Sequence, residues 1–545
     1  YILYSKYSKN IEIFGIYEEN LRSFLEWIKQ LFNESEGKEG KGIFSTSAVF
    51  TTDLHSIGQY IQEGRRDLFE TIINITDMNE EDIIMQIQEN NEDNLNYLEN
   101  MTLDYINKKT MEGALEAHLE GDVPSILITL EKLDEENIGY LIKGTRVNVF
   151  ETKEVTKKIK NKQGKEIDAT IVMKKITYKD VNKTKVAWIE DGYLVSTLNE
   201  AVDERFKNLD FTEKTKKEYK DNKRVKVRGI YVSAHSVALK GRLDELIELA
   251  KKNNINAFVI DVKGDYGELT FPMSESINKY TKSANKNPII KEIEPVIKKL
   301  KDNGIYTIAR IVSFKDTIYA KENPDKIIVY KDGGKAFTNS DGLVWVSAYD
   351  KNLWEYNVTV AKEAAKAGFN EIQFDYVRFP ASNGGKLDKV LNYRNPDNMT
   401  KAEAIQKYLN YAKKELSPYN VYISADIYGQ VGTSSDDMSL GQFWEAVSSE
   451  VDYVSPMMYP SHYGKGVYGL EIPDANPYKT IYNSTKDSIN RNNNISSPAI
   501  IRPWIQAFTA TWVKGHIHYG PKEVKEQIKA MKDLGVDEYI LWSAT

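Results

Sequence analysis

The feature of this chain that most constrains its fold is a regular alternation of short apolar runs with helix-like stretches, which begins at Val225 and continues to the end. Eight of these runs have the length and apolar character of buried strands: VRGIYVS, AFVIDV, YTIARIV, EIQFDYV, VYISADIY, DYVSPMMY, AIIRPWIQAF and EYILWSA. Strands that alternate with helices form parallel β/α units joined by right-handed crossovers. Eight such units predict an α/β fold of the (β/α)8 TIM-barrel type for residues 225–545.

An open, doubly wound parallel sheet is the competing architecture for the same pattern. No GxGxxG or GxxxxGK[ST] motif follows any of the runs, so the usual nucleotide site of such a sheet is missing and the barrel is favoured. The chain stops at Thr545, directly after the eighth run. We therefore expect a helix within residues 202–222, ahead of the first strand, to pack where an eighth helix would lie.

The residues before the barrel do not share this alternation, and we divide them into three parts. Residues 1–138 are predicted to form an α-helical domain, because apolar side chains recur at spacings of three and four: Leu21, Phe24, Leu25, Ile28, Leu31 and Phe32. Residues 139–201 change to an alternation of period two, which predicts a small all-β module. Residues 202–224 are highly charged and helix-prone, and we expect a linker helix there.

The β module contains TRVNVFE, TIVMKKITY and KVAWIEDGYLVS, with a hairpin signal at Asp191 and Gly192. Over about sixty residues it resembles a small bacterial SH3-like barrel. That resemblance implies a module of a kind that often binds cell-wall polymer. A purely structural role fits the same residues equally well.

Composition narrows the classes of partner and chemistry. The net charge of −7 is spread over many acids and bases without a long basic block, so nucleic acid is not an expected partner. Cysteine is absent, which excludes disulfides, thiolate metal sites and cysteine nucleophiles. No apolar stretch of about 18 residues predicts a membrane span. The chain opens on Tyr1 without a methionine, and we expect an export signal or anchor to precede it, as in an extracellular or cell-surface protein.

Polar side chains gather where the predicted strands end, and a TIM barrel keeps its chemistry at that edge. Any one of them is commonly a loop cap, whereas several on adjacent strands indicate a site. The candidates at these ends are Tyr231, His235, Asp261, Lys263, Arg310, Asp375, Arg378, Asp426, Tyr459, Gln506 and Trp542.

Two aspartates suggest what that site does. Asp375 ends the fourth predicted strand and Asp426 lies near the end of the fifth, so their carboxyl groups should meet over one barrel mouth. Cleavage of a glycosidic bond requires one carboxylate at the sugar carbon and one protonated acid at the leaving oxygen. We assign Asp375 as nucleophile or base and Asp426 as general acid, with Asp261 as a rival for either role. Arg310 and Arg378 would keep one acid ionised; alternatively, Asp375 and Arg378 form only a structural ion pair.

Aromatic side chains at or beyond the strand ends support a sugar ligand, because the flat C–H faces of sugar rings stack on them. Trp504 and Trp542, which end the last two strands beside Gln506, are the best candidates for the floor of a subsite. The full aromatic set is Trp345, Tyr349, Tyr376, Tyr428, Tyr459, Trp504 and Trp542.

Metal chemistry is the weaker alternative. His516 and His518 have the HxH spacing that a metal-dependent polysaccharide deacetylase would use, but no third ligand is near them in sequence. The segment DVKGDYGE at residues 261–268 has alternating acids without the other ligands of a calcium loop. No serine lies in a GxSxG elbow. We therefore predict neither a metal site nor a cofactor.

Several motifs of residues 226–545 resemble the bacterial Putative glycosyl hydrolase domain family: FVIDVKGDYGEL, ARIVSFKD, EIQFDYVRFP, DYVSPMMYPSHYG and RPWIQAF. The resemblance implies a TIM barrel related to glycoside hydrolases of the α-amylase type, in which the aspartate after strand four is the nucleophile. Asp375 matches that role. The α-amylase-like pattern has a glutamate acid after strand five, where this sequence has Asp426.

Together these features predict a glycoside hydrolase that cleaves a cell-wall or cell-surface polysaccharide. Two alternatives stay open, beside a third in which the chain is a scaffold whose helical N-terminal part binds a protein partner. One is a glycan-binding barrel without turnover, which would serve wall attachment or assembly. The other is the metal-dependent polysaccharide deacetylase, whose activity a chelator would abolish.

Overall fold

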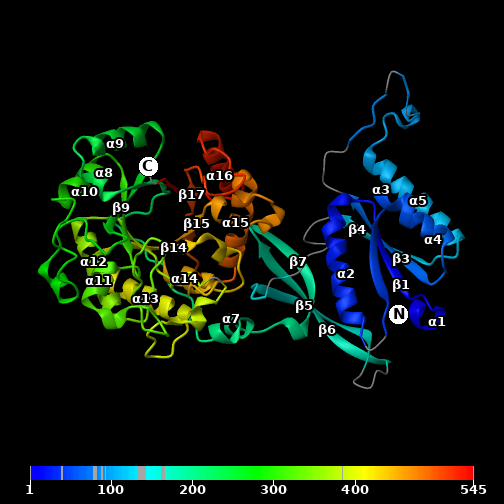
Figure 1. Cartoon of the computed structure of the whole chain (residues 1–545), viewed down its shortest axis with the longest axis horizontal. Coiled ribbons are helices and arrows are strands. Elements are labelled where there is room, and N and C mark those ends of the chain that lie inside the picture. Colours follow the sequence, from blue (N-terminus) through cyan, green and yellow to red (C-terminus); the bar gives the residue numbers. More distant parts are fainter. Residues whose placement is uncertain are drawn as a thin grey trace. The chain divides into compact units, whose positions relative to one another are not determined.

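The computed structural model describes residues 2–543 except 39–40, 78–82, 88–89, 93, 133–140, 142, 161–165 and 383. By its internal contacts the chain divides into two compact units, Tyr1–Leu141 and Ile142–Thr545 (Figure 1). In the described residues no helix combines the length and the apolar character that crossing a membrane requires.

The N-terminal unit is built on a parallel sheet with strand order β2-β1-β3-β4, formed by β1 (Ile11–Ile16), β2 (Phe44–Val49), β3 (Leu68–Asp77) and β4 (Ser125–Lys132). Its helices are α1 (Ile2–Tyr7), α2 (Arg22–Glu36), α3 (Phe50–Asp53), α4 (Gln59–Glu63) and α5 (Leu103–Glu120). The prediction of an α-helical domain is therefore wrong. Ile13 and Ile72 pack in one buried cluster and Phe14 and Ile73 in another, so these strands are apolar on both faces.

The β module belongs to the second unit. It consists of β5 (Val147–Lys160), β6 (Glu166–Asp180) and β7 (Lys183–Glu190), which form an antiparallel sheet in that order. The prediction of β structure is confirmed, but the described residues form an open three-stranded sheet and the SH3-like barrel is not confirmed. The β6–β7 turn is held to the barrel domain by hydrogen bonds from Val181 N to Asn490 Oδ1 (2.7 Å) and from Asn493 Nδ2 to Val181 O (3.0 Å).

The rest of the second unit is a closed parallel barrel, as predicted. Strands follow one another in the order β14-β12-β10-β9-β8-β18-β17-β15, and β14 pairs with β15 to close the circle. β16 also pairs with β15, so β16 and β17 together form one interrupted strand of the barrel. The strands are β8 (Arg228–Val232), β9 (Ala257–Lys263), β10 (Tyr306–Val312), β12 (Glu371–Asp375), β14 (Tyr422–Tyr428), β15 (Tyr453–Met458), β16 (Ile500–Ile501), β17 (Trp504–Gln506) and β18 (Tyr539–Trp542).

Helices cover the outside of the barrel (Figure 1), and their apolar faces pack on the outward side chains of the strands. Ile297, Ala361 and Leu409 belong to this buried layer. The helices are α8 (Ala234–Ala238), α9 (Arg242–Lys252), α10 (Ile293–Asp302), α11 (Thr317–Glu322), α12 (Lys351–Ala367), α13 (Lys401–Leu416), α14 (Trp444–Glu450), α15 (Pro477–Asn492) and α16 (Pro521–Asp533). A short pair of antiparallel strands, β11 (Val329–Tyr330) and β13 (Leu391–Asn392), joins two of the connecting loops.

The predicted helix in residues 202–224 is not present. One helical turn, Glu204–Phe206, follows α7 (Leu198–Ala201), and the rest of the segment is irregular. Lys216 donates to the backbone oxygens of three residues at the end of α14, and Asn222 donates to two oxygens just ahead of β12 and β14. The segment therefore packs against the N-terminal end of the barrel instead of replacing an eighth helix.

Candidate active site

The two predicted acids meet at the C-terminal end of the barrel. β12 is buried along its whole length and ends at Asp375. The register pairs Phe374 with Ala425, so Asp375 and Asp426 follow at the same level of neighbouring strands. Because neighbouring strands lie about 4.8 Å apart, the two carboxyl groups share one small region of the barrel interior.

Arg310 on β10 connects the acids of three segments. Its Nε donates to Asp375 Oδ2 at 2.8 Å, its Nη1 to Asp261 Oδ1 at 2.7 Å and its Nη2 to Asp265 Oδ1 at 3.2 Å. Burial of the guanidinium lowers its pKa, but the negative charges of Asp375 and Asp261 raise it by more. The net change in the pKa of Arg310 is therefore upward. Arg310 is therefore a permanent cation that compensates the charge of Asp375.

Asp426 has a different environment. It is 2% exposed, and the indole nitrogen of Trp504 donates to its Oδ1 at 2.7 Å. Burial and then the negative charge of Asp375 raise its pKa well above the ordinary value of an aspartate. One carboxyl of the pair thus has a bound cation, and the other has the conditions that keep a proton.

Asp261 is the third acid of the cluster. Besides Arg310 it accepts a hydrogen bond from the Tyr231 hydroxyl, whose pKa is raised by burial and by the charge of Asp261. The opening of the cluster lies on this side, because the side chain of Asp265 is 48% exposed while those of Asp261 and Asp375 are 12% and 11% exposed.

Arg378 does not pair with Asp375 in the way that the structural alternative proposed. Its Nη1 donates to the backbone oxygen of Phe379, and its guanidinium lies 5.0 Å from the ring centre of Trp345 and 5.2 Å from that of Tyr376. The cation that holds Asp375 is Arg310. Arg378 instead covers two aromatic rings beside the cluster.

Aromatic rings surround the acids. Trp504 meets Trp542 edge to face at 5.7 Å, and Trp542 packs on Tyr231 at 4.6 Å. Tyr459 is buried in the same group, and its pKa is raised by burial and by the charges of Asp426 and Asp375. Of these four rings, Tyr231 and Trp542 are partly exposed, so a ligand can reach them.

Other predicted binding residues lie in the protein interior. Trp345 is fully buried and Tyr349 packs on Phe379, while Tyr428 is half-buried. Gln506 is fully buried and bonds to protein groups only: Ser461 N donates to its Oε1, and its Nε2 donates to Asp474 Oδ1. Trp345, Tyr349 and Gln506 are therefore too buried to contact a ligand directly.

Lys263 and His235 are not in the cluster. Lys263 is fully buried, forms an ion pair with Asp316 at 2.7 Å and donates to Asn357 on α12. The cause is a β-bulge: Arg310 pairs with Asp261, but the next residue, Ile311, pairs with Lys263, so Lys263 turns outward towards the helices. His235 is exposed on α8, and in the part of the chain that the structure describes no hydrogen bond or ion pair joins it to the acids.

The two histidines of the deacetylase alternative make local bonds. His516 Nδ1 lies 2.9 Å from Val513 O, and His518 Nδ1 lies 3.2 Å from Thr509 Oγ1. Among the residues that the structure describes, no three His, Cys, Asp or Glu side chains gather where they could hold one metal ion. The deacetylase hypothesis stays without structural support.

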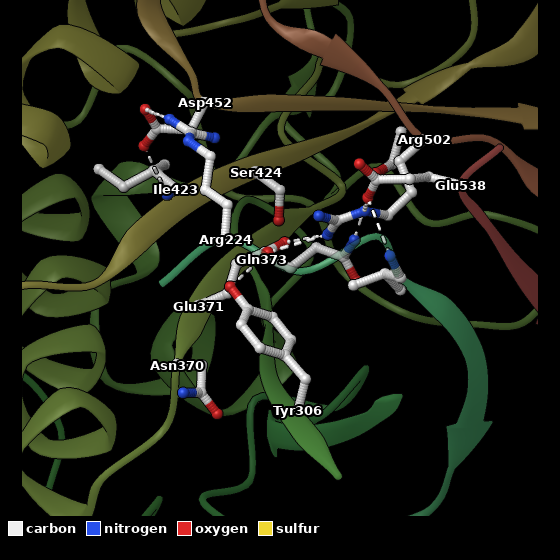
Figure 2. Close-up of polar contacts among 12 residues, drawn as sticks. Arg224, Tyr306, Asn370, Glu371, Gln373, Ile423, Ser424, Asp452, Arg502 and Glu538 are labelled. Carbon is white, nitrogen blue, oxygen red and sulfur yellow. Dashed lines mark hydrogen bonds and ion pairs between the residues drawn. The ribbon is translucent and has the colours of Figure 1, made fainter. Parts of the chain in front are cut away.

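A second buried charge network lies at the opposite end of the barrel interior (Figure 2). Arg502 donates to both carboxylate oxygens of Glu371 (2.9 and 2.8 Å) and to Glu538 Oε2 (2.8 Å), and Tyr306 donates to Glu371. Glu371 and Tyr306 are the first residues of their strands, and Arg502 and Glu371 are fully buried. Solvent barely reaches this network, since Arg502 and Glu371 are fully buried and the side chain of Glu538 is 11% exposed, and we assign it a structural role.

Sequence reasoning missed two charged members of the open cluster, Asp265 and Lys315. Lys315 lies 4.0 Å from the ring centre of Tyr376 and 4.0 Å from Asp265 Oδ2. Asp265 belongs to DVKGDYGE, where the alternating acids were visible but suggested only a calcium loop. Both lie beyond strand ends, in loops whose path cannot be deduced from periodicity.

The barrel sequence matches the family model described as "Putative glycosyl hydrolase domain" over residues 229–545, more than half of the chain. The chain belongs to this family. The membership agrees with the observed barrel and supports a glycosidase-like function for it.

Other proteins resemble parts of the chain. Glucose-6-phosphate isomerase of Bacillus thuringiensis (strain Al Hakam) is 51% identical over 140 residues, which make up 26% of this chain and 31% of that protein. The chain thus spans about a third of the length of the curated relatives it matches. The N-terminal unit, Tyr1–Leu141, has a similar length and precedes the residues matched by the family model.

Two solved structures are also similar. A hypothetical protein from Ruminiclostridium thermocellum is 32% identical, with 36% of this chain and 96% of that chain covered and a TM-score of 0.32. The PgaB (BpsB) glycoside hydrolase domain from Bordetella bronchiseptica is 14% identical, with 58% and 94% covered and a TM-score of 0.43.

Proposed function

We propose that the barrel hydrolyses glycosidic bonds of a polysaccharide by a two-carboxylate mechanism. The observation that carries this proposal is the unlike environment of two carboxyl groups at one level of neighbouring strands. Asp375 is bonded to the cation of Arg310, whereas Asp426 is buried and bonded to Trp504. Glycosidases need this division of roles, because one group must be ionised while the other holds a proton.

In the proposed reaction the carboxylate of Asp375 acts at the anomeric carbon, either by attacking it or by taking a proton from the attacking water. Asp426 gives its proton to the glycosidic oxygen as the bond to carbon breaks. Its raised pKa suits this step, since an aspartate with an ordinary pKa holds no proton at neutral pH. If Asp375 attacks, a water molecule then gives its proton to Asp426 and displaces Asp375 from the carbon, which restores the acid. If Asp375 instead takes the proton from the attacking water, it loses that proton to solvent and Asp426 regains one from solvent.

We assign Asp261 to orientation and not to proton donation. It accepts hydrogen bonds from Arg310 at Oδ1 and from Tyr231 at Oδ2, so both of its oxygens already have partners within the protein. Its bond with Arg310 fixes the plane of the Arg310 guanidinium, which in turn holds Asp375. Tyr231 and Trp542 are then the surfaces on which the sugar at the cleavage point rests, because both rings are partly exposed and Tyr231 bonds to Asp261.

The test is a screen of purified cell-wall and capsule polysaccharides for new reducing ends. Wild type is compared with Asp375→Asn, Asp426→Asn and a matched control, Asp537→Asn, whose surface carboxyl pairs with Lys226 away from the cluster. We expect reducing ends from wild type and the control, and a loss of at least 100-fold in both active-site variants, on the order of what general acid catalysis contributes. Undiminished cleavage by Asp375→Asn contradicts the proposal.

A glycan-binding barrel without turnover is the second candidate. The observation in its favour is the burial of Asp426, which is 2% exposed and already bonded within the protein. In that case no polysaccharide releases reducing ends, and Asp375→Asn leaves glycan binding intact. Measuring binding and cleavage on the same polysaccharides distinguishes the two functions.

We further propose that the substrate is a cell-surface or cell-wall polysaccharide and that the protein acts outside the cell or attached to its surface. The open β5-β6-β7 sheet is the candidate contact with wall polymer. Immunodetection in fractionated cells of the source organism tests the location, and a cytosolic fraction holding all of the protein contradicts it.

A further inference from the structure

An exposed tryptophan stands at the same end of the barrel as the acids. Trp512 is 67% exposed and lies in the loop that follows β17. Its ring stacks on Phe508, with ring centres 5.9 Å apart and planes 22° from parallel, and the ring of His462 meets it at 6.4 Å and 90°. A large apolar ring held in one orientation and open to solvent is the form of a carbohydrate-stacking surface.

The rings beneath Trp512 lead back to the acids. Phe508 packs on Tyr459 at 5.8 Å, and Tyr459 also meets His462 at 5.2 Å. Tyr459 is buried close enough to Asp426 and Asp375 for their charges to raise its pKa. Tyr459, Phe508 and Trp512 thus form a continuous row from the buried acids to the surface.

Buried polar groups fix this row in place. Gln506 accepts from Ser461 N in the loop after β15 and donates to Phe508 O in the loop after β17, so one fully buried amide joins the two loops. Asp474, which is 1% exposed, accepts from Gln506 Nε2 and from Ile517 N. The surface is therefore formed before any ligand arrives, which reduces the entropy lost on binding.

We propose that Trp512, stacked on Phe508 and flanked by His462, is a binding subsite for a pyranose unit of the polysaccharide, away from the point of cleavage. The flat face of the sugar lies on the indole, and its hydroxyl groups reach His462 and the Ser461 hydroxyl, which lie 3.0 Å apart. This inference rests on the proposed function and deepens it: the substrate is an oligomeric chain that extends from the acids to Trp512.

The binding test uses Asp375→Asn as the background, so that no ligand is consumed. Cellohexaose, chitohexaose, xylohexaose, mannohexaose and maltohexaose are titrated by calorimetry, beside the matching monosaccharides. We expect at least one hexaose to bind, with about 10-fold weaker affinity after Trp512→Ala and partial recovery in Trp512→Phe, as for the loss of one stacked ring. Trp27→Ala is the control, since Trp27 is an exposed tryptophan (56%) of the N-terminal unit.

The outcomes separate this inference from the proposed function. If the Asp375→Asn protein binds none of the hexaoses, or binds them equally with and without Trp512, the subsite is refuted whatever the barrel cleaves. If Trp512→Ala weakens hexaose binding although wild type releases no reducing ends, the subsite stands and hydrolysis fails. In an active enzyme, Trp512→Ala should lower kcat/KM for the hexaose about 10-fold and leave a short aryl glycoside within about 2-fold.

Discussion

Replacement of Arg310 by methionine tests the central electrostatic argument without a known substrate. Arg310 bonds to Asp375, Asp261 and Asp265, and its side chain is 6% exposed. Methionine keeps much of the volume but leaves Asp375 and Asp261, whose side chains are 11% and 12% exposed, with little access to water and no cation between them. Removing one partner of a buried ion pair costs about 3–5 kcal/mol, and we expect a loss of that size in the free energy of unfolding at pH 7.

The loss should depend on pH in a defined direction. Without the guanidinium, the buried acids of the folded variant bind protons more readily than the same acids in the unfolded chain. The folded variant then holds more protons than the unfolded one, so its stability falls as the pH rises. The deficit against wild type should therefore be larger at pH 7 than at pH 4.5.

Urea unfolding followed by tryptophan fluorescence reports mainly on the unit that contains the barrel, Ile142–Thr545. Seven of the eight tryptophans lie in that unit, and only Trp27 lies before Leu141. Arg310→Lys is the matched control: it keeps the charge but not the three-way geometry, and it should lose less than the methionine variant. A methionine variant that loses under about 1 kcal/mol, or loses equally at both pH values, refutes the reasoning.

Three more perturbations follow from the same contacts. The pKa of Asp426 is higher in the folded protein than in the unfolded chain, so wild type loses stability as the pH rises above about 4. Asp426→Asn has no such carboxyl and should therefore become more stable relative to wild type over that range. Melting temperatures from pH 4 to 8 test this. Trp504→Phe removes the indole donor from Asp426, so it should lose about 1–3 kcal/mol in urea unfolding and move the alkaline limb of the pH–rate profile to higher pH. Lys263→Met should cost about 3–5 kcal/mol in urea unfolding, because Asp316 stays buried without its cation; a change under about 1 kcal/mol contradicts the buried pair.

The barrel could be predicted from the sequence because parallel strands buried on both faces appear as short apolar runs, and each of the eight runs contains an observed strand. The same signal was present in the N-terminal unit, where IEIFGI, FSTSAV, LFETIINITD and SILITLEK form its sheet. There the strong helical periodicity of residues 21–32 dominated the interpretation. The prediction of a helix in residues 202–224 was wrong for another reason. The charges of this segment favour a helix locally, but Lys216 and Asn222 bond to the end of the barrel instead.

The acidic residues of the site could be predicted from the sequence more reliably than its cationic residues. Strand ends located Asp375, Asp426 and Asp261, because parallel strands bring their carboxyl ends to one edge. Lys263 was assigned to the same edge because it lies two residues after Asp261, and in a regular strand both would face the interior. The bulge opposite Arg310 and Ile311 breaks that period. A bulge depends on how two strands pair, and one strand's sequence does not encode it alone.

Two charge layers inside one barrel explain why only one end is suited to chemistry. At the N-terminal end Arg502 is fully buried between Glu371 and Glu538, and the irregular segment containing Lys216 and Asn222 packs across that end. At the other end the same kinds of residue surround Arg310, yet part of Asp265 remains in contact with solvent. A network whose acid Glu538 is only 11% exposed offers a ligand little access, whereas one that includes the 48% exposed side chain of Asp265 can exchange a partner for a ligand. Exposure, and not the identity of the charged residues, therefore distinguishes the candidate active site from the structural network.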